Sequence, residues 1–100
     1  MEIKMDKNGS ELTVTLVGRL DTMTSPQLEE ELQKELDGVT NLTFDFKDLE
    51  YISSAGLRVL LSTQKHMMKT GEMKVINVSE TIMEIFNVTG FSDIMNVVSA

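Results

Sequence analysis

The strongest constraint on the fold is a regular alternation between two hydrophobic periods along the chain. Residues 12–16 and 42–46 carry apolar side chains at every second position, whereas the segments after them repeat apolar residues every three or four positions. The first spacing is that of a strand with one buried face, and the second is that of an amphipathic helix. The predicted order is strand, strand, helix, strand, helix, strand, helix. Residues 91–100 remain open between a last strand and an unravelled end.

This order favours a parallel sheet, because each helix returns the chain to the start of the next strand by a right-handed crossover. Asn8 and Gly9 lie between the first two strands and are typical of a hairpin turn, so the first strand should pair antiparallel at an edge. We predict an α/β fold with a mainly parallel sheet of four to five strands, an antiparallel edge strand from the N-terminal hairpin, and three or four helices. The length of 100 residues fits one domain, 1–100.

Local signals place the helix ends. Thr24 and Gln27 have the spacing of a capping box, so the first helix should begin there. The second helix is predicted over about 54–70 and ends at Gly71. Residues 47–53 are interpreted as a connection. The inner side of the second helix is expected to carry Leu57, Leu60, Leu61, Gln64, Met67 and Met68.

Charge and composition exclude several classes of function. Nine basic residues stand against 16 acidic ones, a net charge of −7, which argues against nucleic-acid binding and against an anionic membrane surface. The absence of cysteine excludes disulfides and thiolate metal sites and fits a reducing cytoplasm. No apolar stretch approaches the roughly 20 residues of a membrane helix, and the N-terminus lacks the apolar run of a signal peptide. We expect a cytoplasmic protein without a membrane-spanning segment.

The stretch "EYISSAGLRVLL", residues 50–61, joins a predicted strand end to a helix start and contains two adjacent serines. A serine here caps the helix by accepting a backbone N–H, which contributes about 1 kcal/mol. The same position favours a phosphate, because free amides and the positive end of the helix dipole lie there. Both interpretations of Ser53 and Ser54 remain open from the residues alone. Ala55 and Gly56 keep the first turn small enough for a partner to reach a hydroxyl.

Catalytic interpretations are weak by comparison. A serine nucleophile needs a base within hydrogen-bond reach, and His66 lies about three helical turns beyond Ser54. Asp21 and Asp45 end two predicted strands, so parallel pairing would bring both carboxylates to the edge that carries Ser54. They could form turns, bind a metal or act as acid and base. With no phosphate-binding glycine loop, we predict no catalytic residue, no metal and no cofactor.

The chain as a whole resembles the STAS domain, named for sulfate transporters and anti-sigma factor antagonists. The segments that carry the resemblance are "VTLVGRLDTMTSPQLEEEL", "NLTFDFKDLEYISSAGLRVLL", "GEMKVINVSETIMEIFNVTG" and "FSDIM", and the free-standing bacterial antagonists are the most similar members. The resemblance implies that the unphosphorylated chain binds an anti-sigma factor, which is also a serine kinase, and so frees a sigma factor. Phosphorylation then ends the complex, and a metal-dependent serine phosphatase restores the binding form.

The resemblance also assigns residues. Ser54 takes the position of the phosphoacceptor. Ser53 is the second candidate, because it supplies a second hydroxyl at a position where the family frequently has an aspartate. Asp21 and Asp45 match aspartates near the acceptor and at a strand end. Arg58 replaces a small residue one turn after Ser54, where it could pair with a phosphate or contact solvent. The predicted partner-binding residues are Asp21, Asp45, Ser53, Gly56, Leu57 and Arg58.

Two other functions compete with this one. The domain could be a constitutive scaffold or a ligand-sensing interaction module that phosphorylation does not regulate. It could also be a small enzyme that uses Asp21 and Asp45, which would require a pocket with convergent polar groups. We expect a monomer that binds a protein and performs no catalysis.

Overall fold

The computed structural model describes residues 1–99, so Ala100 of the predicted last segment lies outside the described residues. The elements are β1 (Glu2–Asn8), β2 (Glu11–Leu20), α1 (Ser25–Glu35), β3 (Asn41–Asp45), β4 (Leu49–Ile52), α2 (Ser54–Thr70), β5 (Glu72–Val78), α3 (Glu80–Thr89), a short 3-10 helix η1 (Phe91–Asp93) and β6 (Asn96–Ser99).

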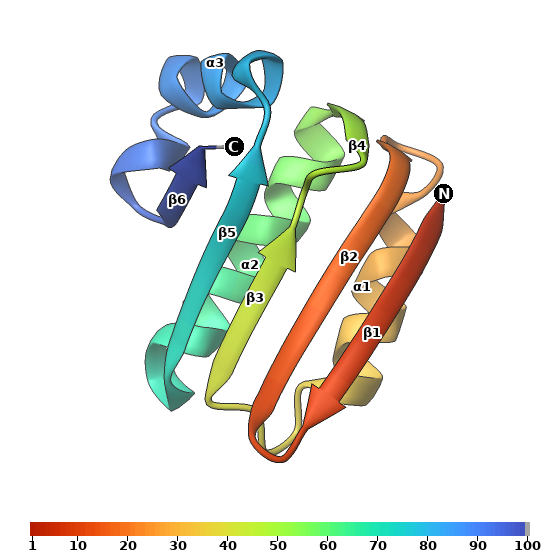
Figure 1. Ribbon diagram of the computed structural model, residues 1–100, viewed down its shortest axis with the longest axis vertical. Coiled ribbons are helices and arrows are strands. Elements are labelled where there is room, and N and C mark those ends of the chain that lie inside the picture. Colours follow the sequence, from red (N-terminus) through yellow and green to blue (C-terminus); the bar gives the residue numbers. More distant parts are fainter. Residues whose placement is uncertain (100) are drawn as a thin grey trace.

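The strands form one twisted sheet in the order β1-β2-β3-β5-β6, and β4 pairs with β2 outside this row (Figure 1). Only β1 is antiparallel to its neighbour, β2, while the other described pairs are parallel. The mainly parallel sheet, the antiparallel edge strand and the number of helices are as predicted. The sheet has six strands instead of four to five, because residues 47–53 contain β4 and the open segment after α3 contains β6.

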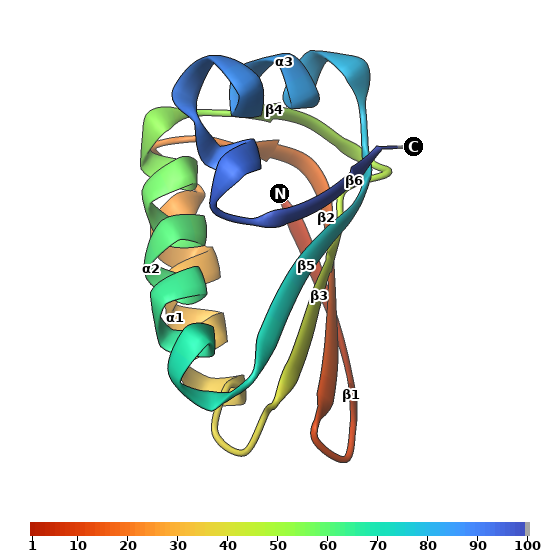
Figure 2. The same cartoon turned by 90° about the vertical axis from the view of Figure 1, so that its left-hand side faces the viewer.

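Helices α1 and α2 lie together against one face of the sheet, and the opposite face carries no helix (Figure 2). The alternation in β2 turns Leu12, Val14 and Leu16 toward the helices, where each side chain is at most 1% exposed. Phe44 on β3 and Phe46, directly after that strand, follow the same alternation and are fully buried. One hydrophobic core therefore lies between the sheet and the two helices.

Strand β4 determines where α2 begins. Strand β2 is longer than β3, and its last residues pair with β4 in the register Gly18–Leu49, Arg19–Tyr51 and Leu20–Ile52. Leu49 and Ile52 are only 4% and 2% exposed, and both side chains anchor β4 in the hydrophobic core. The chain thus crosses the end of the sheet and enters α2 on the helical side (Figure 2). The sequence did not predict this strand, since its two core residues stand three apart and do not alternate.

The ends of α2 agree with the sequence, but two other local predictions are wrong. Helix α2 spans Ser54–Thr70 and ends at Gly71. Thr24 precedes α1, yet its side chain makes no capping bond to the helix, so the predicted capping box does not form. Met68 was expected on the inner side of α2 and is instead 71% exposed, because only Met67 of the pair falls on the buried stripe.

Candidate functional site

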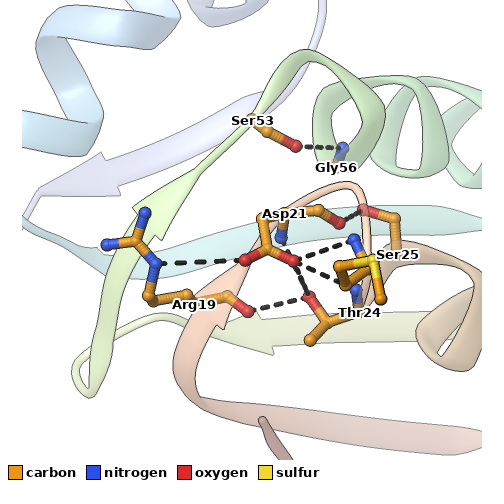
Figure 3. Close-up of polar contacts among 7 residues, drawn as sticks. Arg19, Asp21, Thr24, Ser25, Ser53 and Gly56 are labelled. Carbon is orange, nitrogen blue, oxygen red and sulfur yellow. Dashed lines mark hydrogen bonds and ion pairs between the residues drawn. The ribbon is translucent and has the colours of Figure 1, made fainter.

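The start of α2 is fixed to the end of β2. The backbone N–H of Ser53 donates to the carbonyl oxygen of Leu20 at 2.8 Å, which continues the β2–β4 pairing by one residue. The residue after Leu20 is Asp21, so the Asp21 loop and the first turn of α2 lie next to each other (Figure 3). The fold therefore brings two predicted site residues, Asp21 and Ser53, to the same place.

The two adjacent serines have different roles in the structure. Ser53 is the N-cap of α2, and its Oγ accepts a hydrogen bond from the backbone N–H of Gly56 at 3.3 Å (Figure 3). Ser54 is the first residue inside the helix, and its side chain is exposed. Within residues 1–99 the Ser54 hydroxyl makes no hydrogen bond. One hydroxyl is therefore occupied by the cap and the other is free at the surface.

Asp21 organises the loop between β2 and α1. Its Oδ1 accepts the backbone N–H groups of Met23 at 3.0 Å and Thr24 at 3.1 Å. The hydroxyl of Thr24 in turn accepts the backbone N–H of Asp21 at 2.9 Å and donates to the carbonyl of Arg19 at 2.8 Å (Figure 3). The Asp21 carboxylate thus forms a turn, which is one of the roles that the sequence left open for it.

These contacts also fix the charge of Asp21. The backbone N–H of Thr24 is the main reason that the pKa of Asp21 lies below its ordinary value of 3.8. The Met23 N–H, the Thr24 hydroxyl and the positive charge of Arg19 lower this pKa further, while desolvation of the carboxyl opposes them. Asp21 therefore carries a negative charge beside the start of α2 at neutral pH.

Asp45 does not join this group, contrary to our prediction of a shared edge. Its Oδ1 accepts the backbone N–H of Lys47 and the side-chain amide of Asn77, both at 3.0 Å, so it links the ends of β3 and β5. Strand β4 runs between this point and the start of α2 (Figure 2). Asp45 is accounted for by a structural role in this linkage.

Gly56 and Leu57 lie below the surface that a partner would meet. A Cβ on Gly56 would come within 2.7 Å of the Leu20 side chain and 3.0 Å of that of Ile52, so glycine allows α2 to approach the β2 and β4 ends closely. Leu57 is 7% exposed and belongs to the core. Both residues support the position of the serines, and their contact with a partner stays a prediction.

Arg58 remains at the surface one turn after Ser54. Its side chain is exposed and makes no ion pair within residues 1–99. It lines the groove between α1 and α2 together with Pro26, Glu29 and Ser62. Arg58 is thus available to a phosphate or to a partner.

Sequence reasoning missed a pair of residues beside Asp21. The guanidinium carbon of Arg19 lies 4.5 Å from the centre of the Tyr51 ring, and Arg19 Nε lies 3.9 Å from Asp21 Oδ2. The two residues are 32 positions apart and meet because Arg19 on β2 is in register with Tyr51 on β4. The only sequence signal for this contact would have been recognition of β4 itself.

A metal-binding cluster and a helix of membrane-spanning length are both absent from the described residues. Residues 1–99 contain no group of three or more histidine or carboxylate side chains placed to hold a metal ion. His66 is exposed near the far end of α2. None of the helices in this part of the chain has the length and apolar character required to span a bilayer.

Comparison with known proteins identifies the family. The model of the STAS domain matches residues 2–100. The chain belongs to the STAS domain family. An anti-sigma-B factor antagonist of Bacillus subtilis (strain 168) is 32% identical to this STAS chain over 97% of the chain and 92% of the relative.

Solved structures agree with the STAS fold. An anti-sigma factor antagonist from Mycobacterium paratuberculosis has a TM-score of 0.89 at 20% identity and covers 99% of this chain and 86% of its own. The Bacillus cell fate determinant SpoIIAA in its phosphorylated form has a TM-score of 0.76 at 19% identity, covering 96% of this chain and 90% of its own. At these identities the likeness establishes the STAS architecture.

Proposed function

We propose that this STAS domain is an anti-sigma factor antagonist that phosphorylation of Ser54 switches off. In the unphosphorylated form it binds an anti-sigma factor that is also a serine kinase, and the sigma factor held by that protein is released. The kinase transfers the terminal phosphoryl group of ATP to Ser54, and a serine phosphatase restores the binding form. The name of the Bacillus subtilis relative, which the chain matches over nearly its full length, supports this proposal.

The observation that carries the assignment of Ser54 is the division of roles between the two serines. The Ser53 hydroxyl is engaged with the Gly56 N–H, whereas the Ser54 hydroxyl is exposed and free of hydrogen bonds within residues 1–99. A kinase needs an accessible hydroxyl, and removal of the Ser53 hydroxyl from the cap would cost about 1 kcal/mol. Ser54 is therefore the favoured acceptor and Ser53 the second candidate.

Electrostatics explain how one phosphate can end a complex. A phosphoserine adds about −1.5 to −2 charges at neutral pH. The new charge would lie next to the ionised Asp21 at the centre of the partner-facing surface, where a partner fitted to the bare first turn of α2 would meet both a dianion and added bulk. A change of occupancy from 99:1 to 1:99 requires about 5.5 kcal/mol of differential binding. Lost contacts and repulsion together are of the required size.

The partner-facing surface in this proposal consists of the Asp21 loop, the two serines and Arg58. The domain acts by binding, as a monomer, and its own side chains perform no reaction. Asp45 supports the sheet and makes no contact with the partner in this scheme, because its carboxylate is engaged with Lys47 and Asn77.

The acceptor is tested by phosphorylation in vitro. The purified chain is incubated with ATP and the anti-sigma factor kinase from the same genome, and the added mass is measured by mass spectrometry. Wild type and Ser53→Ala should each gain one phosphate, while Ser54→Ala should gain none. Stoichiometric phosphorylation of Ser54→Ala would contradict the assignment. Loss of the phosphate in Ser53→Ala alone would move the site to Ser53.

The switch is tested by binding. Affinity for the kinase is measured by calorimetry for wild type, for the phosphorylated chain and for Ser54→Ala. Phosphorylation should lower the affinity about 10⁴-fold, as a change from 99:1 to 1:99 requires, whereas Ser54→Ala should bind like wild type. Equal affinity of the phosphorylated and unphosphorylated chains would favour the constitutive scaffold instead.

A further inference from the structure

The surface next to the two serines carries an arginine stacked on a tyrosine. Arg19 lies 4.5 Å above the centre of the Tyr51 ring and 3.9 Å from a carboxylate oxygen of Asp21. The Arg19 side chain is 59% exposed and the Tyr51 residue is 38% exposed, so both contact solvent while they contact each other. The pair therefore forms a stacked contact that is open to solvent.

Met23, two residues after Asp21, carries an exposed apolar side chain on the same loop. It is 86% exposed, the highest value among the large hydrophobic residues that lie at the surface of residues 1–99. Its backbone N–H donates to Asp21 Oδ1 at 3.0 Å, which fixes the loop that carries it. The apolar surface of the Met23 side chain is exposed to solvent. Burial of this surface against another protein would stabilise the complex.

The chemistry of these three residues is that of a binding anchor. Arginine, tyrosine and methionine are enriched at the centres of protein interfaces, and arginine and tyrosine are frequent among residues that dominate the binding energy. Stacking on Tyr51 and attraction to Asp21 hold the Arg19 guanidinium in place before a partner arrives. Less side-chain entropy is then lost on binding.

The charge of the site defines what the anchor can receive. Arg19 meets Asp21 through Nε at 3.9 Å, and its two terminal NH2 groups make no ion pair within residues 1–99. A guanidinium with free terminal groups binds a carboxylate through two parallel hydrogen bonds. The neighbouring Asp21 attracts a positive charge. A partner therefore needs an acidic side chain over Arg19 and a basic one over Asp21, and this alternation sets the register of docking.

We propose that Arg19, Tyr51 and Met23 form an anchor patch that binds a carboxylate and an adjacent apolar side chain on the anti-sigma factor kinase. This inference rests on the proposed function, because it names the same partner. The anchor patch adjoins Ser54 through the Leu20–Ser53 hydrogen bond. Contacts at the anchor patch supply affinity for the kinase. Phosphorylation of Ser54, which lies at the border of the anchor patch, removes that affinity.

The anchor patch is tested with two pairs of variants in a calorimetric titration of the unphosphorylated chain with the anti-sigma factor kinase. Arg19→Glu is compared with Lys65→Glu, which makes the same charge change on an exposed part of α2. Met23→Gln is compared with Met68→Gln, which removes an exposed methionine, 71% accessible, far along α2. Arg19→Glu should weaken binding about 30-fold or more and Met23→Gln about fivefold.

Each result has a distinct meaning. The control variants should bind within about twofold of wild type, the range expected for exposed positions outside an interface. Thermal unfolding is measured for every variant. If Arg19→Glu fails to fold, the comparison of Met23→Gln with Met68→Gln decides. Binding by Arg19→Glu and Met23→Gln equal to that of their controls would overturn the anchor patch alone. A wild-type chain that binds no such kinase would overturn the proposed function as well.

Discussion

At the scale of single residues, Asp21 combines a structural role with an electrostatic one. Oδ1 closes the β2–α1 turn by accepting the N–H groups of Met23 and Thr24, and Oδ2 lies 3.9 Å from Arg19. The loop conformation that presents Met23 and the charge that faces the start of α2 therefore depend on the same carboxylate. A substitution that alters only its charge separates the two roles.

Asp21→Asn is such a substitution, since the amide oxygen can still accept both backbone N–H groups. The folded chain binds the Asp21 proton less readily than the unfolded chain, because the pKa is lowered in the fold. The extra stability of wild type should therefore be present above pH 3.8, the ordinary pKa of the carboxyl, and be lost as the pH falls through the lowered pKa of the folded chain. We expect a higher melting temperature for wild type than for Asp21→Asn at pH 7, and a smaller difference at acid pH. A difference that grows toward acid pH would contradict this sign.

At the scale of elements, the sequence predicted what depends on local signals and missed what depends on pairing between distant segments. The bounds of α2 followed from a serine before its first turn and Gly71 after its last, so residues 54–70 were predicted as they are found. Strand β4 exists because β2 is longer than β3 and leaves its last residues open to a parallel partner. The four residues of β4, taken alone, indicate neither the unpaired end of β2 nor the resulting contact of Arg19 with Tyr51.

The same limit affected the candidate site. Ser53, Ser54 and Asp21 lie together because β4 pairs with the end of β2 and the Ser53 N–H donates to the Leu20 carbonyl, although the sequence did not predict β4. Asp45 also ends a strand, but β4 was read as a loop, so its separation from α2 by that strand was not foreseen. Gly56 was expected to keep the first turn small enough for a partner to reach a hydroxyl, whereas the structure shows that the close approach of α2 to Leu20 requires glycine there.

Ile52 is the residue through which β4 controls the position of α2. It is 2% exposed and precedes the N-cap of the helix. Ile52→Ala should destabilise the fold by about 3 kcal/mol, because the cavity is only partly filled. It should also speed hydrogen exchange at the Ser53 amide, which bonds to Leu20. Urea unfolding and amide exchange measure the two effects.

Val88→Ala is the matched control for this prediction. Val88 is 82% exposed on α3, so its truncation removes apolar atoms without opening the core and should change stability by no more than about 0.5 kcal/mol. If Ile52→Ala loses no more stability than Val88→Ala, β4 does not anchor the start of α2.

At the scale of the whole molecule, the proposed phosphorylation site lies outside the core that holds the fold together. The core fills the space between the sheet and the inner sides of α1 and α2 (Figure 2). Ser54, in contrast, is exposed at the start of α2. A phosphate on Ser54 would meet solvent, the first amides of the helix and the charge of Asp21, without displacing a buried side chain. The chain carries a net charge of −7, so one phosphoserine changes the global charge by a modest fraction. The switch therefore needs no second fold.

Phosphorylation of Ser54 should accordingly leave the backbone nearly unchanged. We expect amide chemical shifts to change at residues 19–25 and 53–58 and to stay constant in the β1–β2 hairpin and in α3. The unfolding free energy should change little, because attraction of the phosphate to the helix N-terminus, about 0.3–1 kcal/mol, is opposed by repulsion from Asp21. Two-dimensional NMR of the chain before and after kinase treatment measures this, with kinase-treated Ser54→Ala as the control. Shift changes throughout β3, β5 and α3 would mean that the phosphate acts by rearranging the fold, whereas confined changes together with lost kinase binding would locate the switch in the chemistry of the surface.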